Sequence, residues 1–312
     1  HDPNISVVQP LMLPYAHILG IRRFNRSSVI RKVRKKLNTL GVSSPILVST
    51  VPNACDYVGA FNEQKVVYYC VDDFAHWPGH DEDYITRLED ELIAKSDVFV
   101  ATSQKLYDRL SAYGKPTHLL THGVDVQHFS NLPETEHPVL ADIPKPRVGY
   151  FGLFDERTDQ ELVREVAKSS PEVSFVFTGR VEADHARISD LENVHFTGPV
   201  PYQDLPAVLA GWDMCMLPYK VDEFSENINP LKIKEYLAAG KQAICTPLPA
   251  AVSLNGYVKV CSKSQEWVDS IKKALQEANN IEISESNKEL RSFINAESWS
   301  AKAEFFLTYT AY

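Results

Sequence analysis

Residues 229–240 read Asn-Pro-Leu-Lys-Ile-Lys-Glu-Tyr-Leu-Ala-Ala-Gly, and this stretch predicts a short helix with a signal at each end. Asn229 suits the position before the helix, because its side-chain oxygen can accept from the free N–H groups of the first turn. Pro230 then falls at the first helical position, where its missing N–H costs nothing. Gly240 follows the last helical residue, where a left-handed backbone is usually needed. The stretch therefore predicts a helix over Pro230–Ala239.

Lys232 and Glu235 give this predicted helix a charged face near its start. They lie three residues apart, so they project from the same side. A helix N-terminus attracts anions through its free N–H groups and its dipole, and a lysine there strengthens the attraction. A carboxylate about 5 Å further along suits the two hydroxyls of a ribose. The spacing fits a nucleoside diphosphate, but an ordinary solvated pair has the same spacing, so both interpretations stay open at this point.

Length and composition are those of a globular protein with room for two cores. The chain has 312 residues, of which 44% are hydrophobic and 23% charged. No apolar run approaches the roughly 18 residues that a membrane-spanning helix needs. The five cysteines are scattered without a CxxC pair, which indicates buried thiols in a reducing compartment and no zinc site. Asp81-Glu82-Asp83 has the form of a metal-binding D-x-D, but it stands at the acidic start of a predicted helix, and we expect no metal there.

Basic residues gather in one segment of an otherwise acidic chain. The net charge is -9, yet residues 22–36 contain only basic charges. Val29, Val33 and Leu37 share one helical face, which predicts a helix that packs on a core and points its charge outward. Such a patch fits an anionic membrane surface or a phosphorylated substrate better than nucleic acid, and a merely solvated helix explains it equally well. The basic residues are Arg22, Arg23, Arg26, Arg31, Lys32, Arg34, Lys35 and Lys36.

Strand-like and helix-like segments alternate cleanly in the C-terminal part, which predicts a parallel sheet covered on both faces. The N-terminal part alternates less regularly. The two parts meet in a proline-rich, acidic stretch, so we expect an N-terminal domain over residues 1–130, a linker over 131–146 and a second domain over 147–296. The predicted strands are Ile5–Gln9, Pro45–Thr50, Lys65–Asp72, Val98–Thr102, Thr117–His122, Arg147–Gly152, Val173–Gly179, Val194–Gly198, Met214–Pro218 and Gln242–Thr246, and the other predicted helices include Asp81–Ser96, Gln160–Lys168 and Gln203–Ala210.

The beginning of the chain has two unusual features. It starts at His1 without a methionine, and its first half lacks an opening strand followed by a glycine-rich turn. From these features we expect a truncated or processed product.

Several blocks of sequence, taken in order, resemble the family-4-type retaining glycosyltransferases of GT-B architecture. The blocks are Tyr69–Phe74, Ala101–Ser103, His122–Asp125 with Phe129, Gly149–Gly152, Asn193–Pro201, Leu205–Pro206, Leu217–Tyr219, Asn229–Gly240 and Thr246–Pro249. Within the family, the bacterial branch of teichuronic-acid and exopolysaccharide transferases is the most similar. The resemblance implies an α/β fold of two Rossmann-like, doubly wound domains facing across a cleft. It also implies a terminal helix in residues 297–312, begun by Trp299, that crosses back onto the N-terminal domain.

The resemblance further implies roles at the nucleotide-sugar donor. Glu235 resembles the carboxylate that holds the ribose hydroxyls. Lys232 and Arg157 resemble the cations that neutralise the diphosphate as it leaves, where positive charge stabilises the developing anion. The family usually has a lysine shortly after that arginine, whereas this chain has Asp159 nearby. We therefore expect Lys232 to carry more of the phosphate charge.

Other donor contacts follow from the same resemblance. Gly149 and Gly152 would let the loop after their strand approach a ligand closely. Arg180 is a candidate for the base pocket or the phosphates. The family often has a glutamate eight positions before the ribose carboxylate, but here an asparagine stands there, so the sugar hydroxyls are expected to meet this asparagine or N–H groups of residues 224–228. The donor-binding residues expected in this loop are Asn227, Ile228 and Asn229.

Three polar residues in the N-terminal part are candidates for the acceptor side. Asp72, Asp73 and His76 follow a strongly apolar run, Val66–Val71. Ligands lie at the carboxyl ends of strands in such folds, so we expect one of the three to contact the acceptor hydroxyl or the transferred sugar. Capping of the following turn is the alternative for an aspartate.

The sequence thus predicts a cytoplasmic enzyme, with the basic helix docking at the inner face of the membrane. It would transfer a sugar with retention from a UDP- or GDP-sugar to a glycan or lipid-linked acceptor in surface polysaccharide synthesis. We expect no metal and no cofactor, because Lys232 and Arg157 would neutralise the leaving diphosphate. A nucleotide-sugar epimerase of the same architecture and a non-catalytic nucleotide-sugar-binding module are the alternatives.

Overall fold

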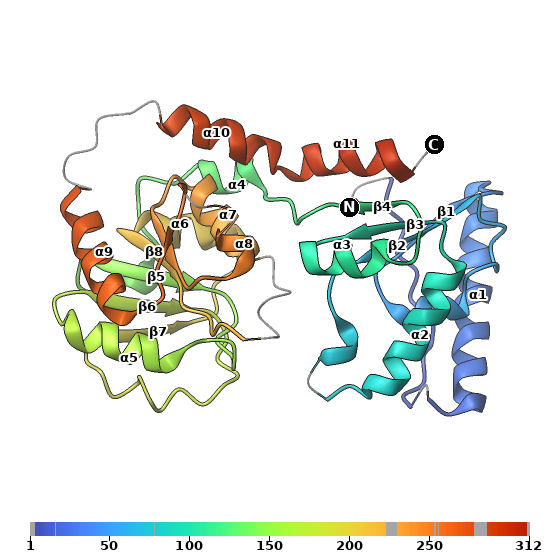
Figure 1. Ribbon diagram of the computed structural model, residues 1–312, viewed down its shortest axis with the longest axis horizontal. Helices are drawn as coiled ribbons and strands as arrows, with labels where there is room; N and C mark the ends of the chain where they lie inside the picture. The colour runs from blue at the N-terminus through green and yellow to red at the C-terminus, as the bar shows by residue number, and fades with distance from the viewer. Residues whose placement is uncertain are drawn as a thin grey trace. The chain divides into compact units, whose positions relative to one another are not determined.

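A computed structural model describes residues 4–15, 17–77, 79–222, 230–252, 254, 256–277 and 286–310 (Figure 1). The chain forms two compact units, one up to Thr121 together with the residues from Phe305 on, and one over His122–Glu304. The second unit therefore begins earlier than the domain boundary expected from the sequence. The reason is packing, since Val124, Phe129 and Leu140 are buried in the second unit's core.

The first unit is a four-stranded parallel sheet in the order β1-β2-β3-β4. These four strands confirm four predicted strands. Each observed end lies within three residues of the predicted end. Asp81 caps the second helix by accepting from the N–H of Tyr84, so the acidic triplet begins a helix as expected. The elements are α1 (Leu19–Leu40), β1 (Ile46–Ser49), the 3-10 helix η1 (Pro52–Asp56), β2 (Lys65–Cys70), the 3-10 helix η2 (Phe74–His76), α2 (Glu82–Lys95), β3 (Val98–Ala101), α3 (Gln104–Ser111) and β4 (Thr117–Leu119).

The two faces of this sheet are covered by different parts of the chain. On one face, Tyr68 and Phe99 pack with buried leucines of α2 and α3. On the other face, Val67 and Val100 pack with Phe306. Phe306 belongs to helix α11 (Trp299–Thr310), which starts in the second unit and crosses back to the first. The terminal helix that the resemblance implied is thus present.

The prediction of a strand at Ile5–Gln9 is wrong. Residues 5–13 form no regular element, and backbone groups of two of them bond to side chains of α1. The amide of Asn25 bonds both the N–H and the carbonyl of Leu13, at 2.8 and 2.9 Å. Lys32 donates to the carbonyl of Gln9 at 2.9 Å. The alternating apolar side chains that suggested a strand are exposed.

Helix α1 confirms the predicted basic helix, but not all of its charge points outward. Arg22 forms ion pairs with Asp56 and Glu91, and three other basic residues donate to backbone carbonyls of the same unit. Those three are Lys32, and Arg26 and Arg34, which bond the carbonyls of Asp56 and Ala60. Half of the basic segment therefore anchors α1, and the other half is available to the solvent.

The second unit is a six-stranded parallel sheet in the order β10-β9-β8-β5-β6-β7. Five of its strands confirm the predicted ones, whereas the short strand β10 and the helix α9 escaped prediction. The elements are α4 (Val126–Ser130), the 3-10 helix η3 (Pro138–Leu140), β5 (Arg147–Phe151), α5 (Gln160–Ser169), β6 (Ser174–Thr178), β7 (Val194–Gly198), the 3-10 helix η4 (Tyr202–Asp204), α6 (Leu205–Ala210), β8 (Met214–Leu217), α7 (Leu231–Ala238), β9 (Ala243–Cys245), α8 (Pro249–Val252), β10 (Lys259–Val260), α9 (Ser264–Glu277) and α10 (Ser286–Ala296).

The chain reverses its direction across this second sheet at β5. From β5 it proceeds to β6 and β7 on one side, and then returns to β8, β9 and β10 on the other. Right-handed crossovers in opposite directions place their helices on opposite faces, which makes the sheet doubly wound. Helices α5 and α9 pack together, and α7 packs with α4 and α10 (Figure 1).

All five cysteines are free and buried, as the sequence predicted. Burial raises the pKa of the thiols of Cys55, Cys70 and Cys245 to about 12, and raises the pKa of Cys215 further. These thiols therefore behave as small apolar side chains within the two cores.

Candidate functional site

The reversal of strand order puts the carboxyl ends of β5 and β8 side by side, which is where doubly wound sheets bind ligands. Gly152 follows β5 directly, and Tyr219 comes two residues after the end of β8. Helix α7 follows β8 in the chain, and it brings Lys232 and Glu235 to this part of the second unit. The predicted donor residues of α7 and of the β5 loop thus come together.

Lys232 is held by a chain of tyrosine hydroxyls. Its ammonium group lies 3.2 Å from the hydroxyl of Tyr219, which lies 3.2 Å from the hydroxyl of Tyr150. Tyr150 donates to the carbonyl of Leu153 at 2.6 Å. Since each hydroxyl has one hydrogen, Lys232 donates to Tyr219 and Tyr219 donates to Tyr150. The ammonium group also lies over both rings, 5.5 and 5.8 Å from their centroids, and among the described residues it donates a hydrogen bond only to Tyr219.

Gly152 makes room for this lysine. A Cβ atom at Gly152 would lie 2.3 Å from Cε of Lys232, and the φ angle of +125° is one that only glycine adopts easily. Gly149 has a different role, because a Cβ atom there would lie 2.0 Å from the ring of Trp212. The expectation that Gly149 serves ligand approach is therefore wrong, and this glycine serves core packing.

Arg157 lies at the same end of the sheet but already has an anionic partner. Its Nε and a terminal nitrogen bond both oxygens of Asp155, at 2.5 to 2.9 Å. The guanidinium group also lies 5.4 Å from the ring centroid of Tyr219. Asp159, near the place where the family usually has a lysine, caps α5 by accepting from the N–H of Leu162. Lys232 is thus the cation with more capacity for an added anion.

Glu235 is the buried carboxylate of the site. It is 6% exposed, and within the described ranges nothing donates a hydrogen bond to it. Burial raises its pKa to about 7, against an opposing effect of Lys232 one turn earlier. Burial disfavours the ionised form of this carboxylate, so it suits a ligand that brings hydroxyl groups.

Arg180 lies after β6 beside a pocket of about 240 Å³ at the carboxyl ends of β5, β6 and β7. Its side chain is 73% exposed and lies 3.9 Å from Glu182. Gly152, Pro199 and Val200 also line the pocket. Pockets for drug-sized ligands usually hold about 300–1,000 Å³, so this one suits a part of a ligand such as a flat ring.

The three acceptor-side candidates belong to the first unit, so the predicted catalytic set is divided between the units. Asp73 and His76 lie together, with His76 Nδ1 3.0 Å from the Asp73 carboxylate. Nε2 of the same histidine is 3.6 Å from Glu82. Asp72 accepts from the N–H of Asp73 at 2.8 Å. This bond fits capping of the following turn, which was the alternative to an acceptor contact for an aspartate. The acceptor role of these residues stays a prediction.

Part of the predicted donor loop lies outside the described residues. This applies to Asn227, Ile228 and Asn229. The predicted first residue of the helix, Pro230, instead precedes it, because its ψ angle of 103° is extended and α7 begins at Leu231. Gly240 has the left-handed backbone predicted for it, with a φ angle of +68°.

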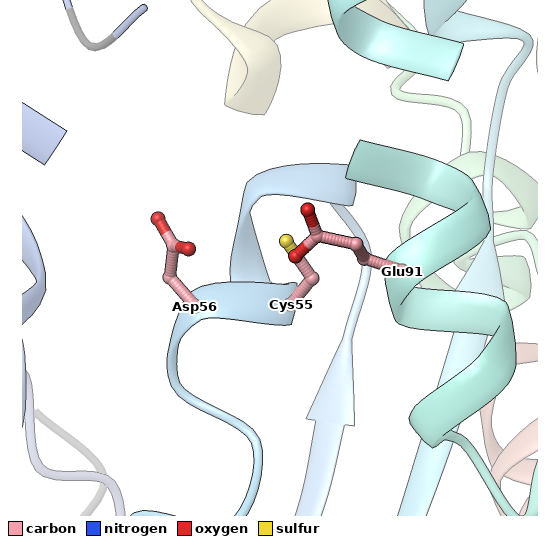
Figure 2. Close-up of side chains that lie close together, drawn as sticks. All are labelled: Cys55, Asp56 and Glu91. Carbon is pink, nitrogen blue, oxygen red and sulfur yellow. The ribbon is translucent and has the colours of Figure 1, made fainter. Parts of the chain in front are cut away.

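The tightest grouping of possible metal ligands in the described chain lies elsewhere. Figure 2 shows Cys55 and Asp56 of η1 near Glu91 of α2, with their ligand atoms within 4.8 Å of one another. A cation of the protein already serves this group: Arg22 bonds Asp56 at 2.9 and 3.1 Å and Glu91 at 3.2 Å. The raised pKa keeps the thiol protonated, whereas metals bind thiolate. The group is therefore an anchor for α1.

Sequence reasoning missed the side chains that orient the candidate donor-binding residues. Tyr150 and Tyr219 hold Lys232, and Asp155 holds Arg157. Tyr150 is the penultimate residue of β5, Tyr219 follows β8, and Asp155 lies in the loop after β5, which is a signal that the sequence does contain. The contact between the two tyrosines, however, depends on strand order, and strand order is not visible in a single sequence.

The fold and the site at its reversal point define a GT-B architecture, and solved structures agree. Sucrose-phosphate synthase of Thermosynechococcus elongatus superposes with a TM-score of 0.70 at 16% identity, over 98% of this chain and 82% of that one. Alr3699/HepE of Anabaena, solved in complex with UDP, gives 0.69 at 14% identity, over 91% and 81%. The predicted GT-B fold is thereby confirmed.

Sequence comparison points the same way. Residues 145–277 match the family described as Glycosyl transferases group 1. TuaH of Bacillus subtilis (strain 168), whose curated name assigns it provisionally to teichuronic acid biosynthesis as a glycosyltransferase, is 25% identical over 237 residues. The match covers 72% of this chain and 59% of TuaH, so the chain spans less than two thirds of that relative. The resemblance to this branch of glycosyltransferases is confirmed.

Proposed function

We propose that this chain transfers a sugar, with retention, from a UDP- or GDP-sugar to a glycan or lipid-linked acceptor during synthesis of a surface polysaccharide. The match to Glycosyl transferases group 1 supports the reaction class, and the biosynthetic role given to TuaH supports the type of product. The UDP in Alr3699/HepE supports the type of donor.

The buried carboxylate of Glu235 carries this proposal. It lies one turn after Lys232, at the end of the sheet where ligands bind, and no described group satisfies it. A ribose diol would supply two hydroxyl donors to it while the diphosphate meets Lys232 and the start of α7. The pocket beside Arg180 would take the base.

In this scheme the protein supplies position and charge. Lys232 stabilises the diphosphate as it leaves, because its ammonium group is fixed by Tyr219 before the donor arrives. The acceptor hydroxyl attacks from the face that the diphosphate leaves, and a phosphate oxygen takes its proton. Asp73 and His76 orient the acceptor or the transferred sugar. We propose that no metal and no cofactor takes part.

We also propose that the protein works in the cytoplasm at the inner face of the membrane, where lipid-linked acceptors are found. None of the described helices is long and apolar enough to cross a bilayer. The contact would therefore be peripheral, and helix α1 supplies the positive charge for it.

A thermal-shift panel tests the donor site. UDP-, GDP-, ADP- and dTDP-sugars are added to the wild type, to Glu235→Ala and to Glu172→Ala, which changes an exposed glutamate of the same unit. We expect a UDP- or GDP-sugar to stabilise the wild type and the Glu172→Ala control. The Glu235→Ala variant should lose about 100-fold in affinity, because two charge-assisted hydrogen bonds disappear. Equal affinity in all three proteins would refute the ribose assignment.

The same donor then distinguishes transfer from the alternatives. Incubation with a glycan or lipid-linked acceptor should give a new glycosidic bond of the donor's own anomeric configuration. An isomerised sugar in the absence of an acceptor would instead identify an epimerase. Binding without any turnover would identify a nucleotide-sugar-binding module.

A further inference from the structure

Three helices of the second unit enclose a pocket that lies apart from the proposed donor site. The pocket has a volume of about 540 Å³, and residues of α4, of α10 and of the end of α7 line it (Figure 1). Pockets of about 300–1,000 Å³ hold small-molecule ligands, so this one has room for a whole ligand. Lys232 lies in the first turn of α7, about 10 Å along the helix axis from Ala239 at its end. The pocket is therefore not explained by donor binding.

The floor of this pocket is apolar. Leu237 of α7 and Ile294 of α10 are each 3% exposed, and Val126 and Leu290 are half-buried. Ala238 and its neighbours at the end of α7 have small side chains, which leaves space above these residues. A ligand in the pocket therefore needs a face of low polarity that can lie on the floor.

Neutral polar side chains stand at the edge of the pocket. Ser130 of α4 and Asn295 of α10 are both exposed and line it. Within the described ranges, neither the hydroxyl of Ser130 nor the side-chain amide of Asn295 forms a hydrogen bond. A hydroxyl and an amide can both donate and accept, so together they suit a ligand with several hydroxyl groups.

The end of α7 adds backbone acceptors to the same pocket. The last carbonyl groups of a helix have no partner within it. The carbonyl of Tyr236 accepts from the N–H of Lys241, and that of Leu237 accepts from the N–H of Gly240, each at 3.0 Å. The carbonyl groups of the last two pocket-lining alanines, residues 238 and 239, accept from none of the described residues. They suit a ligand that donates hydrogen bonds.

Arg291 gives the pocket a single positive charge. Among the described residues that line the pocket, it alone is charged, and it is exposed. It has no acidic partner in the described chain, and Glu297 further along is already paired with Lys234 and Lys302. One guanidinium group beside neutral acceptors suits one carboxylate, whereas a diphosphate would bring more negative charge than the pocket balances.

We propose that this pocket binds a sugar that carries a carboxylate, such as a hexuronic acid unit of the polysaccharide. The carboxylate pairs with Arg291. Hydroxyl groups of the sugar bond Ser130, Asn295 and the free carbonyl groups of α7, while the less polar face of the ring lies on Leu237 and Ile294. The inference rests on the proposed function and deepens it, because it makes the glycan acidic and gives it a second point of attachment in the unit that binds the donor.

Ligand-detected NMR with the whole chain tests the pocket. Methyl β-D-glucuronide is compared with methyl β-D-glucoside, which has a hydroxymethyl group in place of the carboxylate, and excess UDP keeps the donor site occupied. We expect the wild type to bind the glucuronide about tenfold more tightly. Arg291→Gln should abolish this preference. Lys288→Gln makes the same change of charge on α10 outside the pocket and should keep it. A wild type without the preference, or an equal loss in both variants, would overturn the proposal.

Two further measurements separate a sugar site from a site for any carboxylate. Asn295→Leu keeps the size of the side chain but removes the amide, and it should weaken glucuronide binding severalfold. Unchanged binding in this variant would overturn the assignment of the sugar, as would acetate that displaces the glucuronide at equal concentration.

The melting temperature and the shift produced by UDP-glucose are recorded for each variant. Unchanged values show that the fold and the donor site are intact. A wild type that binds the glucuronide but no UDP- or GDP-sugar would refute the transferase proposal and not the pocket. A wild type that binds such a donor but not the glucuronide would refute the pocket alone.

Discussion

Glu235 illustrates how much a single side chain in this protein depends on its surroundings. Burial raises its pKa from 4.5 to about 7, although Lys232 opposes the change. Because the folded pKa is the higher one, the stability linked to this group is complete below about pH 4.5 and is lost as the pH rises to about 7. The loss amounts to about 3 kcal/mol. A bound ligand that donates hydrogen bonds to Glu235 would stabilise the ionised form of its carboxylate.

Donor binding should therefore depend on pH through Glu235. The ionised carboxylate accepts both ribose hydroxyls, so affinity for a UDP-sugar should rise with pH and level off above about 7, with up to a tenfold change per unit below it. Both phosphates of such a donor are doubly esterified and keep their charge over this range. Titration calorimetry between pH 5.5 and 8.5 measures the profile. The Glu235→Gln variant should bind more weakly with a flat profile, and an unchanged slope in this variant would place the titrating group elsewhere.

Gly152 should be essential for the placement of Lys232. In Gly152→Ala the new Cβ atom meets Cε of the lysine at 2.3 Å, so the ammonium group must leave the hydroxyl of Tyr219. We expect a loss of about 1–2 kcal/mol in folding stability from the backbone strain, and at least a tenfold loss of donor affinity.

Gly240→Ala is the matched control for this change. Gly240 also has a positive φ angle, but a Cβ atom there meets nothing within 4 Å. It should cost similar stability and leave donor affinity nearly unchanged. If both variants lose affinity alike, strain rather than the position of Lys232 is responsible.

Helix α7 is tied to its unit by further polar contacts, through Tyr236 and Lys234. The hydroxyl of Tyr236 accepts from the N–H of Phe151 at 3.3 Å. Lys234, whose pKa is lowered by burial, donates to the carbonyl of His122 and pairs with Glu297 at 2.5 Å. Glu297 also pairs with Lys302, at 2.7 Å, in α11. The helix that carries the donor candidates is thus fastened to the start and to the end of its unit.

Glu297→Gln should destabilise the protein by about 3 kcal/mol, because it removes the carboxylate that pairs with the buried ammonium group of Lys234 at 2.5 Å. Chemical denaturation measures the loss. Replacing the lysine as well, in Lys234→Met/Glu297→Gln, should recover part of it. The exposed pair of Lys273 and Glu277 is the control, and Glu277→Gln should leave stability unchanged within error. A Glu297→Gln protein as stable as the wild type would contradict the buried ion pair.

Elements with strong local signals were predictable from sequence. The apolar runs that become β5, β6, β8 and β9 are fully buried strands and β7 is half-buried, and the ends of all five were correct to about one residue. The segment at Ile5–Gln9 has alternating apolar residues, but Lys32 of α1 binds the carbonyl of Gln9 and the segment joins no sheet, which no local pattern reveals. The two-residue strand β10 is too short to give a signal of its own.

For the molecule as a whole, the sequence predicted two parallel sheets and the α/β class, but not the detailed surroundings of the site. Lys232 and Glu235 were placed together because they share one helix. The contact between Tyr150 and Tyr219, by contrast, joins segments that are 69 residues apart in sequence. In the same way, residues 22–36 were predicted as one basic helix, and only the folded unit shows which of its cations bond to the rest of the unit.

The burial of every native cysteine has a practical consequence for the study of motion between the two units. Buried thiols react slowly with maleimides, because the reagent cannot reach them. A cysteine introduced on the surface of each unit would then be labelled selectively, without removal of any native one. A fluorophore pair attached in this way would report directly whether a nucleotide sugar changes the distance between the units.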